Sequence, residues 1–513
     1  MSGYVPNPPK NYRYEEAKPV DIHAQRWAEY EKHGKEPAPQ PEKIGIALRI
    51  GVFFDGTGNN ANNTAAGLLC GAQHPIAPKD IPASCMPYMS DPDSSYGAGP
   101  TNVKKLHSLY KKTEAAEIVG SIKYISRPIY IDGIGTETNQ KDSVLGSGTG
   151  RGDTGVAGRV QTSFTEIERT IEQVLQDNPD IEIASLTFDT FGFSRGAAAA
   201  RHFSNEVVRG KRGPLGNLLN RNARDFNRTF DCQYGYGIKM GFIGLFDTVP
   251  SIAGFTNFGR VKSPIAPGVK LYLDRQFFSD VVHLVARDEC RANFALSRVK
   301  PAHPEYTFPG VHSDIGGSYL DDVEECVLVS PMQTLAVSRY TDVSTTSIYL
   351  DAARAKSQWI AKGWPAHLLE IVTPASFDIP QERQDRLSQG QKRVYAALQL
   401  KRPVSGKLSR IYLRVMHQLA KEKGVQFSDI PEDDEYSIPE ELQSLCDRFL
   451  AGDYRTTLED ESLLRLKYIH TSANWNHPLG RTDGSGIDAV YINAPTEDAI
   501  RVQHPHVPDW KLW

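Results

Sequence analysis

Long apolar runs alternate with helically spaced segments over the first two thirds of this chain. Residues 44–56 (IGIALRIGVFFDG) are a nearly unbroken apolar run that ends at Asp-Gly, as expected of a strand that is buried on both faces and followed by a loop. Residues 121–135 (SIKYISRPIYIDGIG) are predicted to be a second strand, and residues 235–251 (GYGIKMGFIGLFDTVPS) repeat the apolar run that ends in Asp and a turn. Strands that alternate with helices in this way predict an α/β fold with a mostly parallel sheet.

Helical spacing appears between these strands. Residues 101–112 (TNVKKLHSLYKK) and 163–176 (SFTEIERTIEQVLQ) carry apolar side chains at helical intervals, and Ser163 followed by Glu166 forms a capping-box start. Residues 57–100, in contrast, are rich in Gly, Asn, Pro, Ser and Ala. So long an irregular stretch is typical of a binding loop or a lid.

The pattern changes at both ends of this α/β region, which we predict to span residues 44–350. Residues 1–43, rich in Pro, Glu and Lys, are expected to form an N-terminal arm. Residues 351–470 carry helical patterns separated by Pro and Gly, which predicts a helical C-terminal appendage. A lid or membrane-contacting module is one role for it, and the alternative, favoured for each helix taken singly, is a helix that packs on the core. Residues 471–513 are expected to pack back on the core as a short strand and loops. The helices expected in the appendage are residues 381–400, 406–424, 439–452 and 458–470.

Charge and composition exclude several classes of protein. The net charge of −4 gives no reason to expect a nucleic-acid partner. The sequence has no run of about eighteen apolar residues that would span a membrane. Its polar, Pro-rich N-terminus lacks the apolar core of a secretory signal. We therefore expect synthesis in a cytosol, with any export by another route.

The segment Gly192-Phe193-Ser194-Arg195-Gly196 fits the pattern G-x-S-x-G, and its context favours a nucleophile elbow. An apolar strand precedes it and an Ala-rich helix follows it. A serine in so strained a turn requires glycine two positions before and after it, because side chains there would meet neighbouring backbone. The helix N-terminus then offers the Arg195 N–H to an oxyanion. The alternative is a Gly-rich strand–helix turn without catalysis.

A serine nucleophile needs a histidine base, and His312 is the best candidate downstream. It follows a short β-like run and precedes a Gly-rich turn, and a loop at a strand end is where such a base belongs. His202 lies on the helix that follows Ser194 and points away from it. His303, flanked by prolines, and His283, in a helix-like segment, are expected to be structural.

The base in turn needs a carboxylate to orient it. Asp247 ends a buried strand, which places it on the same rim of the sheet as Ser194, so we rank it first. Asp314 ranks second, because it is close to His312 in the sequence and orients it with difficulty. Asp189 precedes the elbow on its own strand and is expected to point into or under the sheet. The alternative role for Asp247 is to cap a turn.

A second oxyanion donor is expected from the loop after the first strand, FDGTGNN. The backbone amides of Gly56 and Thr57 are the candidates, since glycines there let the chain approach a ligand. Asp55 could instead indicate an ion, but its spacing to Asn59 and Asn60 is not that of a calcium loop. We therefore predict no metal.

Neither the cysteines nor the Gly-rich loop indicates a cofactor. The six cysteines form no CxxC pair, and we expect free thiols, with a Cys70–Cys85 disulfide as the alternative. Residues 146–158 (GSGTGRGDTGVAG) lack the Lys-Ser/Thr ending of a P-loop and are expected to be a flexible loop near the mouth of the active site. No cofactor is therefore predicted.

Five segments of the sequence occur in the order in which a known protein family has them: FFDGTGNN, GFSRGAAAAR, GLFDTV, HLVARDECRANF and FPGVHSDIGGSY. Over residues 44–321, with a weaker echo at 468–475, the chain resembles the bacterial type VI secretion lipase effectors of the GxSxG class, first family. These are α/β-hydrolase phospholipase effectors. The resemblance implies a catalytic triad of Ser194, Asp247 and His312, which agrees with the ranking from the residues alone.

The same resemblance implies a biological role. It implies phospholipase A activity on glycerophospholipids at the membrane surface of a target cell. The protein would be made in the cytoplasm of one bacterium and would act as an antibacterial toxin in the periplasm of another. Its partners would be a type VI spike carrier protein and a periplasmic immunity lipoprotein. Asp288, Glu289 and Arg291 match a family segment that we expect to be a structural ion-pair cluster.

Two other functions fit the same residues. A soluble carboxylesterase or thioesterase would use the same triad, and it would cleave short water-soluble esters but not phospholipid vesicles. A catalytically silent binding module would keep the fold and would not react with a fluorophosphonate. The acyl position that is cut, A1 or A2, is open in all of this.

Overall fold

The computed structural model describes residues 44–69, 95–113, 117–119, 122–136, 155–179, 181–221, 226, 230–250, 268–380, 390–476 and 493–508 of the 513-residue chain. The expectations for the N-terminal arm, for Cys70 and Cys85, and for most of the Gly-rich loop 146–158 lie outside these described residues.

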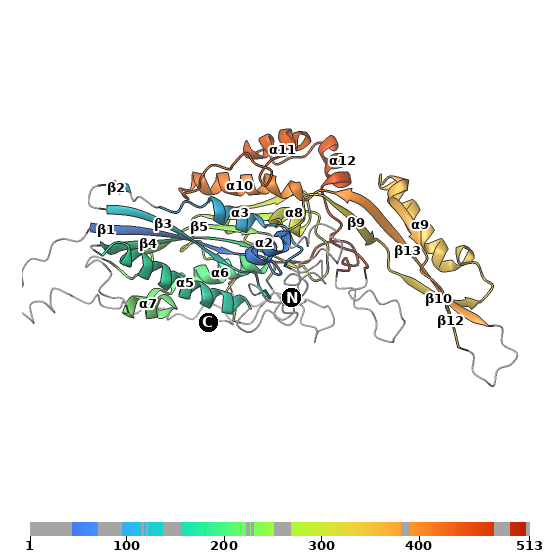
Figure 1. Cartoon of the computed structure of the whole chain (residues 1–513), viewed down its shortest axis with the longest axis horizontal. Coiled ribbons are helices and arrows are strands. Elements are labelled where there is room, and N and C mark those ends of the chain that lie inside the picture. The colour runs from blue at the N-terminus through green and yellow to red at the C-terminus, as the bar shows by residue number, and fades with distance from the viewer. Residues whose placement is uncertain are drawn as a thin grey trace, which may run out of the picture.

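A seven-stranded sheet in the order β2-β3-β1-β4-β5-β6-β8 forms the centre of the molecule (Figure 1). Within the described residues, β2 pairs antiparallel with β3, and the other neighbouring strands of this sheet pair in parallel. The predicted mostly parallel α/β sheet is therefore confirmed. Its strands are β1 (Ile44–Phe54), β2 (Glu117–Val119), β3 (Ile122–Ile131), β4 (Ile181–Phe193), β5 (Ile238–Phe246), β6 (Val281–Ala286) and β8 (Glu305–Phe308).

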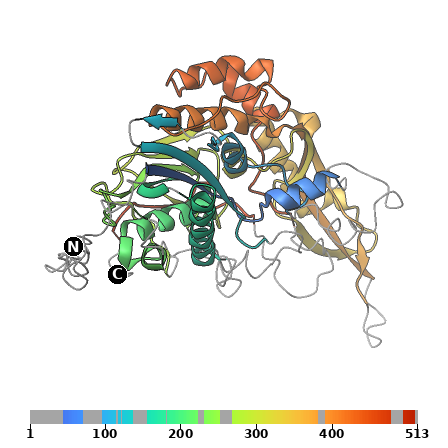
Figure 2. The same cartoon turned by 60° about the vertical axis from the view of Figure 1, so that its left-hand side comes forward.

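Helices cover both faces of this sheet, as Figures 1 and 2 show from two sides. On β1, Val52 and Phe54 pack into the cluster beneath α5 and α6, whereas Phe53 packs into the cluster beneath α3 and α10. Both faces of the strand are therefore buried, which explains its unbroken apolar run. The flanking helices are α5 (Val156–Gln176), α6 (Arg195–Val208) and α7 (Leu215–Arg221) on one side, and α3 (Asn102–Leu109), α8 (His312–Gly316) and α10 (Ser409–Glu422) on the other.

Helix α5 begins at Val156 and not at the predicted capping box. Ser163 lies inside the helix, where its hydroxyl donates to the carbonyl of Val160 at 2.7 Å. Val156 and Val160 continue the buried stripe of the helix toward its N-terminus, and Gly155 occupies the N-cap position. The burial of this stripe, rather than the Ser163 hydroxyl, therefore determines where the helix starts.

A second sheet extends from one end of the molecule, centred on β13 (Gln391–Val404) (Figure 1). The helix predicted over residues 381–400 is wrong for residues 391–400, which belong to this strand, and residues 381–389 lie outside the described part of the chain. The prediction of a helical appendage over residues 351–470 is wrong for residues 369–404, where three strands form, and the sheet to which they belong begins earlier, at Val323. The elements of this unit are β9 (Val323–Leu328), β10 (Gln333–Ser338), β11 (Leu369–Val372), β12 (Phe377–Asp378) and α9 (Ser347–Ala361).

The reason is that β13 is covered on both faces over part of its length. Val394, Ala396, Leu398 and Leu400 alternate along one face, where they pack in two clusters that include residues of α9, and Tyr395 and Ala397 on the opposite face are also buried. A strand covered in this way reads as a short continuous apolar run, which by its periodicity cannot be distinguished from a buried helix.

The helices predicted within 406–424, 439–452 and 458–470 are confirmed as α10, α11 (Glu440–Leu450) and α12 (Leu458–Lys467). Tyr412 and Met416 on the inner face of α10 are fully buried, so this helix is a layer of the core. Among the described residues, none of the helices is long and apolar enough to cross a membrane.

The last described segment, residues 493–508, lies along the main body of the molecule. Its strand β14 (Gln503–His504) pairs in parallel with β7 (Leu296–Ser297). The remaining short elements are α2 (Ala61–Leu69) and the 3₁₀ turns Gly210–Arg212, Val343–Thr345, Ala366–Leu368 and Gly406–Leu408.

Candidate active site

Ser194 lies between the end of β4 and the start of α6, with φ 59° and ψ −122°. A positive φ is strained for a residue with a side chain, so the surrounding contacts must hold it in place. Its N–H donates to the carbonyl of Phe246 at 3.0 Å, and its carbonyl accepts from Val249 N at 3.3 Å. The serine is thus tied to the end of the neighbouring strand β5.

The two glycines of the G-x-S-x-G segment are required by their surroundings. A Cβ on Gly192 would lie 2.3 Å from the carbonyl oxygen of Gly196. A Cβ on Gly196 would lie 2.3 Å from the carbonyl oxygens of both Phe54 and Asp55. These are backbone atoms of β1 and of the elbow itself, so the clash could be relieved only by moving the sheet.

His312 and Asp247 form a buried pair at the same edge of the sheet. Nδ1 of His312 lies 2.5 Å from Oδ2 of Asp247, and both side chains are almost fully removed from solvent. Asp247 directly follows β5 with φ 43°, and His312 begins α8 after β8. Because β4, β5 and β8 are parallel strands of one sheet, their carboxyl ends bring Ser194, Asp247 and His312 to one rim.

Aromatic rings fix the plane of the His312 imidazole. The ring of Phe193, the residue before the serine, packs on it with centroids 4.6 Å apart, and Phe294 contacts it edge-on at 4.9 Å. Since Nδ1 faces Asp247, Nε2 is the nitrogen left to exchange a proton with another group. Ser194 and His312 do not make a hydrogen bond within the described residues, and such bonds commonly tighten only when substrate binds.

A buried arginine that sequence reasoning missed also contacts Asp247. Arg501 donates from Nη1 to Oδ1 at 2.7 Å and from Nη2 to Oδ2 at 2.8 Å. Burial alone would raise the pKa of Asp247, but the charge of Arg501 and the hydrogen bond of His312 outweigh it and hold that pKa well below its ordinary value. Asp247 is therefore a carboxylate at neutral pH.

Burial has the opposite effect on the imidazole. It disfavours the imidazolium and lowers the pKa of His312, although Asp247 favours the charged form. The positive charges of Arg291 and Arg501 add to the lowering. A neutral imidazole with Nδ1–H donated to Asp247 is the form suited to accept a proton at Nε2.

Asp314, the second candidate acid, has another partner. Its Oδ1 lies 2.7 Å from Nδ1 of His470, and its Oδ2 accepts the backbone N–H of Val311 at 2.9 Å. His470 stacks on Tyr319 with ring centroids 3.6 Å apart. Asp314 thus ties the loop that carries His312 to the C-terminal part of the chain and does not face the imidazole of His312.

The other residues that the sequence singled out lie outside this cluster. Asp189 is buried and pairs with Arg49 and with the hydroxyl of Tyr110. His283 was expected in a helix-like segment and lies instead in strand β6, where its side chain contacts Glu305. His303 contacts the carbonyl of Leu273, and His202 accepts from the amide of Lys270.

Two members of the predicted ion-pair cluster, Glu289 and Arg291, pair with each other and support the His312 loop, whereas Asp288 pairs with Arg287. Arg291 pairs with Glu289 at 2.8 Å, and Glu289 accepts the backbone N–H of His312 at 3.2 Å. Ser472 also donates to Glu289. Burial would raise the pKa of Glu289, but Arg291 outweighs it and lowers that pKa to about 2, so the carboxylate stays charged.

The loop after β1 differs from expectation at Gly56. Its N–H donates to Oδ1 of Asp55 at 2.7 Å, so in this structure it is not directed at an oxyanion. Asp55 also accepts the hydroxyls of Thr101 and Tyr130, and burial raises its pKa to about 6. The Thr57 hydroxyl is buried and has no hydrogen-bond partner in the described part of the chain.

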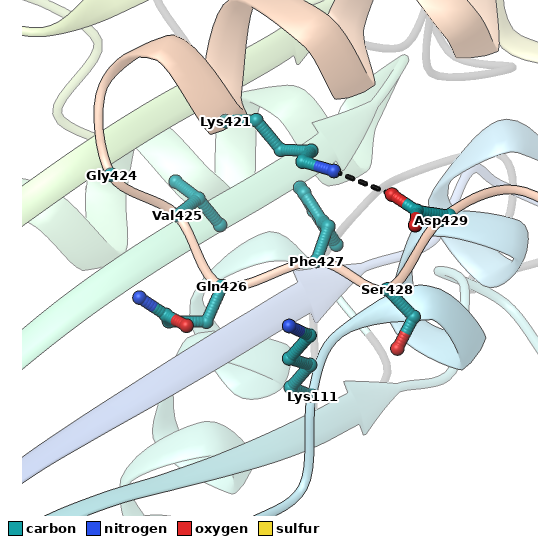
Figure 3. Close-up of a pocket in the computed structure, with 8 residues that line it drawn as sticks. All are labelled: Lys111, Lys421, Gly424, Val425, Gln426, Phe427, Ser428 and Asp429. Carbon is teal, nitrogen blue, oxygen red and sulfur yellow. Dashed lines mark hydrogen bonds and ion pairs between the residues drawn. The ribbon is translucent and has the colours of Figure 1, made fainter.

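No metal-binding cluster of three or more His, Cys, Asp or Glu side chains occurs among the described residues. A hollow of about 490 Å³ lies between Lys111 and residues 424–429, beside the Lys421–Asp429 ion pair (Figure 3). Its lining includes none of Ser194, Asp247 and His312, so it is separate from the candidate active site.

Comparisons with known proteins bear on this geometry. Residues 211–341, which include Asp247 and His312, match the family described as type VI secretion phospholipase effector Tle1-like, catalytic domain. The chain is 29% identical to the Tle1 effector in its structure bound to the VgrG spike from the type 6 secretion system; 92% of this chain and 97% of that chain are covered, with a TM-score of 0.67. An uncharacterized protein from Pseudomonas aeruginosa is 18% identical over 81% of this chain and 52% of that chain, with a TM-score of 0.36, which is too low to bear on function. The search of curated proteins gives no match.

The two informative matches agree. The family match contains the strand end that carries Asp247 and the loop that carries His312, and the structural match extends over nearly the whole chain. Residues 211–341 therefore match the catalytic domain of Tle1-like type VI secretion phospholipase effectors, and the chain as a whole is similar to the Tle1 effector.

Proposed function

We propose that this protein is a phospholipase A of the α/β-hydrolase type, which cleaves fatty-acyl esters of glycerophospholipids with Ser194, His312 and Asp247 as its triad. The observation that carries the proposal is the buried His312–Asp247 pair, at 2.5 Å, on the sheet rim where the strained Ser194 elbow lies. A histidine oriented by a buried carboxylate is what a serine needs in order to act as a nucleophile at neutral pH.

In the acylation step, Ser194 Oγ attacks the carbonyl carbon of an acyl ester while Nε2 of His312 takes its proton. The Asp247 carboxylate stabilises the imidazolium that forms. When the tetrahedral intermediate collapses, His312 gives the proton to the leaving oxygen. The lysophospholipid departs and the fatty acid remains esterified to Ser194.

In the deacylation step, water takes the place of the alcohol. His312 accepts a proton from the water, which attacks the acyl-enzyme and releases the fatty acid, and the proton returns to Ser194. The developing oxyanion is bound by two backbone amides, that of Arg195 at the start of α6 and that of Thr57. The N–H of Gly56 does not contribute, because it is donated to Asp55.

We further propose that the protein is an antibacterial toxin. It would leave the cytoplasm of the producing bacterium on a type VI spike and act on membrane phospholipids in the periplasm of a target cell. The spike is supported by the related Tle1 effector, which is bound to VgrG in its structure. An immunity lipoprotein in the periplasm would protect cells that carry the toxin.

A fluorophosphonate probe tests the nucleophile separately from the substrate. Wild-type protein should be labelled, and Ser194→Ala should not be. A soluble carboxylesterase or thioesterase would also be labelled, but it would hydrolyse short esters and leave phospholipid vesicles intact. If the folded wild type is not labelled, the protein is a binding module and the proposal is wrong.

A further inference from the structure

The guanidinium of the buried Arg501 is hydrogen-bonded to Asp247 and to the backbone of Phe294. Its guanidinium makes two parallel bonds to Asp247, at 2.7 and 2.8 Å, and the side chains of the pair are 4% and 0% exposed. Its Nε donates to the carbonyl of Phe294 at 2.7 Å. Because hydrogen bonds are made on both of its edges, the planar guanidinium has a single orientation. A two-pronged contact is the strong form of an arginine–carboxylate ion pair.

Backbone pairing delivers Arg501 to this position. The amide of Leu296 donates to Val502 O at 2.9 Å, and the amide of Arg298 donates to His504 O at 3.0 Å. These bonds lie just after Arg501 in the C-terminal segment and attach it to β7. Arg501 is thus a buried residue whose position is fixed by backbone pairing, unlike an arginine in an ion pair on the surface.

The Asp247 carboxylate has few other ways to satisfy its charge. Oδ1 also accepts the N–H of Ala286 at 2.9 Å, and Oδ2 faces His312. A buried carboxylate without a countercharge is strongly disfavoured, and a neutral imidazole supplies no countercharge before the reaction begins. Arg501 is therefore the cation that compensates Asp247 in the resting protein.

Several charged groups surround the imidazole of His312 and must be considered together. Asp247 lies at the end of β5, Glu289 and Arg291 lie in the segment after β6, and Arg501 lies in the C-terminal segment. Asp314, on the same short helix as His312, is paired with His470. Arg291 is matched by Glu289, which leaves Arg501 as the cation matched to the carboxylate that faces the imidazole.

We propose that Arg501 is a positioning residue of the triad, whose guanidinium keeps the Asp247 carboxylate charged and aimed at His312 Nδ1 and so sets the pH range in which His312 accepts a proton. The inference rests on the proposed triad. It adds a fourth residue, which acts through Asp247 and does not touch the substrate.

Arg501→Met and Arg501→Lys in the full chain test this, with the labelling rate of Ser194 by a fluorophosphonate followed from pH 5 to 9. In Arg501→Met, we expect the rate to fall about 100-fold, because the carboxylate loses its orientation. The acid limb of the pH–rate profile should move up by about one pH unit, because the imidazolium of His312 is no longer repelled by the positive charge of Arg501. In Arg501→Lys the positive charge remains but the two-pronged contact with Asp247 is lost. We therefore expect about a 10-fold lower labelling rate and an acid limb at the wild-type pH.

Arg49→Met is the matched control, since it removes another two-pronged arginine–carboxylate pair, between the half-buried Arg49 and the buried Asp189. It should lower stability without moving the acid limb. The inference is wrong if Arg501→Met labels at the wild-type rate with an unmoved limb, or if Arg49→Met moves the limb equally.

If Arg501→Met does not fold, the labelling rate of Arg501→Lys tests the inference instead. Its rate penalty should vanish in an Asp247→Asn background, because Arg501 acts through that carboxylate. An equal penalty in both backgrounds, or no penalty in either, overturns the inference. In each of these cases the wild type is still labelled at Ser194, so the proposed nucleophile stands; a wild type that is not labelled refutes the triad itself.

Discussion

Asp247 and His312 are 65 residues apart in the chain, yet Oδ2 of one lies 2.5 Å from Nδ1 of the other in a part of the molecule closed to solvent. The contact depends on three parallel strands that end at one rim: β4 before Ser194, β5 before Asp247 and β8 before His312. The sheet thereby places each residue of the proposed triad, and the predictions below test different parts of this arrangement.

Asp247→Asn should lower the rate of ester hydrolysis about 10⁴-fold, because the amide cannot hold the imidazole in the reactive tautomer. Asp314→Asn should have a much smaller effect, about 10-fold or less, because Asp314 faces His470 and only supports the loop. Steady-state hydrolysis of a short-chain ester by the two variants measures both. If Asp247→Asn keeps most of its activity and Asp314→Asn loses it, Asp314 is the acid.

The pH dependence follows from the burial of His312. Burial lowers the pKa of His312, and a general base is active only when it is unprotonated, so the acid limb of kcat/KM should fall below the ordinary histidine value of about 6.5. Activity should therefore be nearly constant from pH 7 to 8. A profile measured with an uncharged ester gives the midpoint, and a midpoint above about pH 7 would contradict this account.

Gly196→Ala should abolish labelling of Ser194 and destabilise the protein by about 1–3 kcal/mol or more, because its Cβ would meet the backbone of β1 at 2.3 Å. Gly235→Ala is the control. Gly235 has φ 92° with open space around it, so alanine there should cost about 1–2 kcal/mol and leave labelling intact. Chemical denaturation and labelling of both variants make the comparison. Normal labelling of Gly196→Ala would show that the elbow is less tightly packed than described.

Helix α10 should contribute to the stability of the main domain. Leu413→Ala removes a fully buried side chain from the cluster between this helix and the sheet, and we expect a loss of about 2–5 kcal/mol. Leu458→Ala, at a site that is 91% exposed, should change the free energy of unfolding by less than about 0.5 kcal/mol. Equal effects in urea denaturation would mean that α10 is a loosely attached lid.

The sequence was sufficient for features that depend on local patterns. Two-sided burial produced the unbroken apolar runs of β1 and β5, and the strand–turn–helix context marked Ser194. The carboxyl ends of parallel strands then indicated which Asp and which His would share its rim. Each of these inferences used residues that lie next to one another in the chain.

Other features depend on contacts that no local pattern encodes. Arg501 lies in an ordinary-looking loop sequence, 254 residues from Asp247, and no motif spacing connects the two. His470 falls in the weakly matching stretch 468–475, which gave no hint of a bond to Asp314. The apolar part of β13 resembles a helix in its sequence because its two covered faces remove the period-two pattern of a strand.

The release of fatty acid from glycerophospholipid vesicles, compared between wild type and Ser194→Ala, tests the central claim most directly. We predict that the wild type releases one fatty acid for each lysophospholipid formed, and that Ser194→Ala, folded to the same extent, releases none above background. Phospholipids with distinguishable acyl chains would also identify the position that is cut. Intact vesicles with a wild type that labels at Ser194, or equal release by both proteins, would contradict the assignment of Ser194 as the nucleophile of a phospholipase.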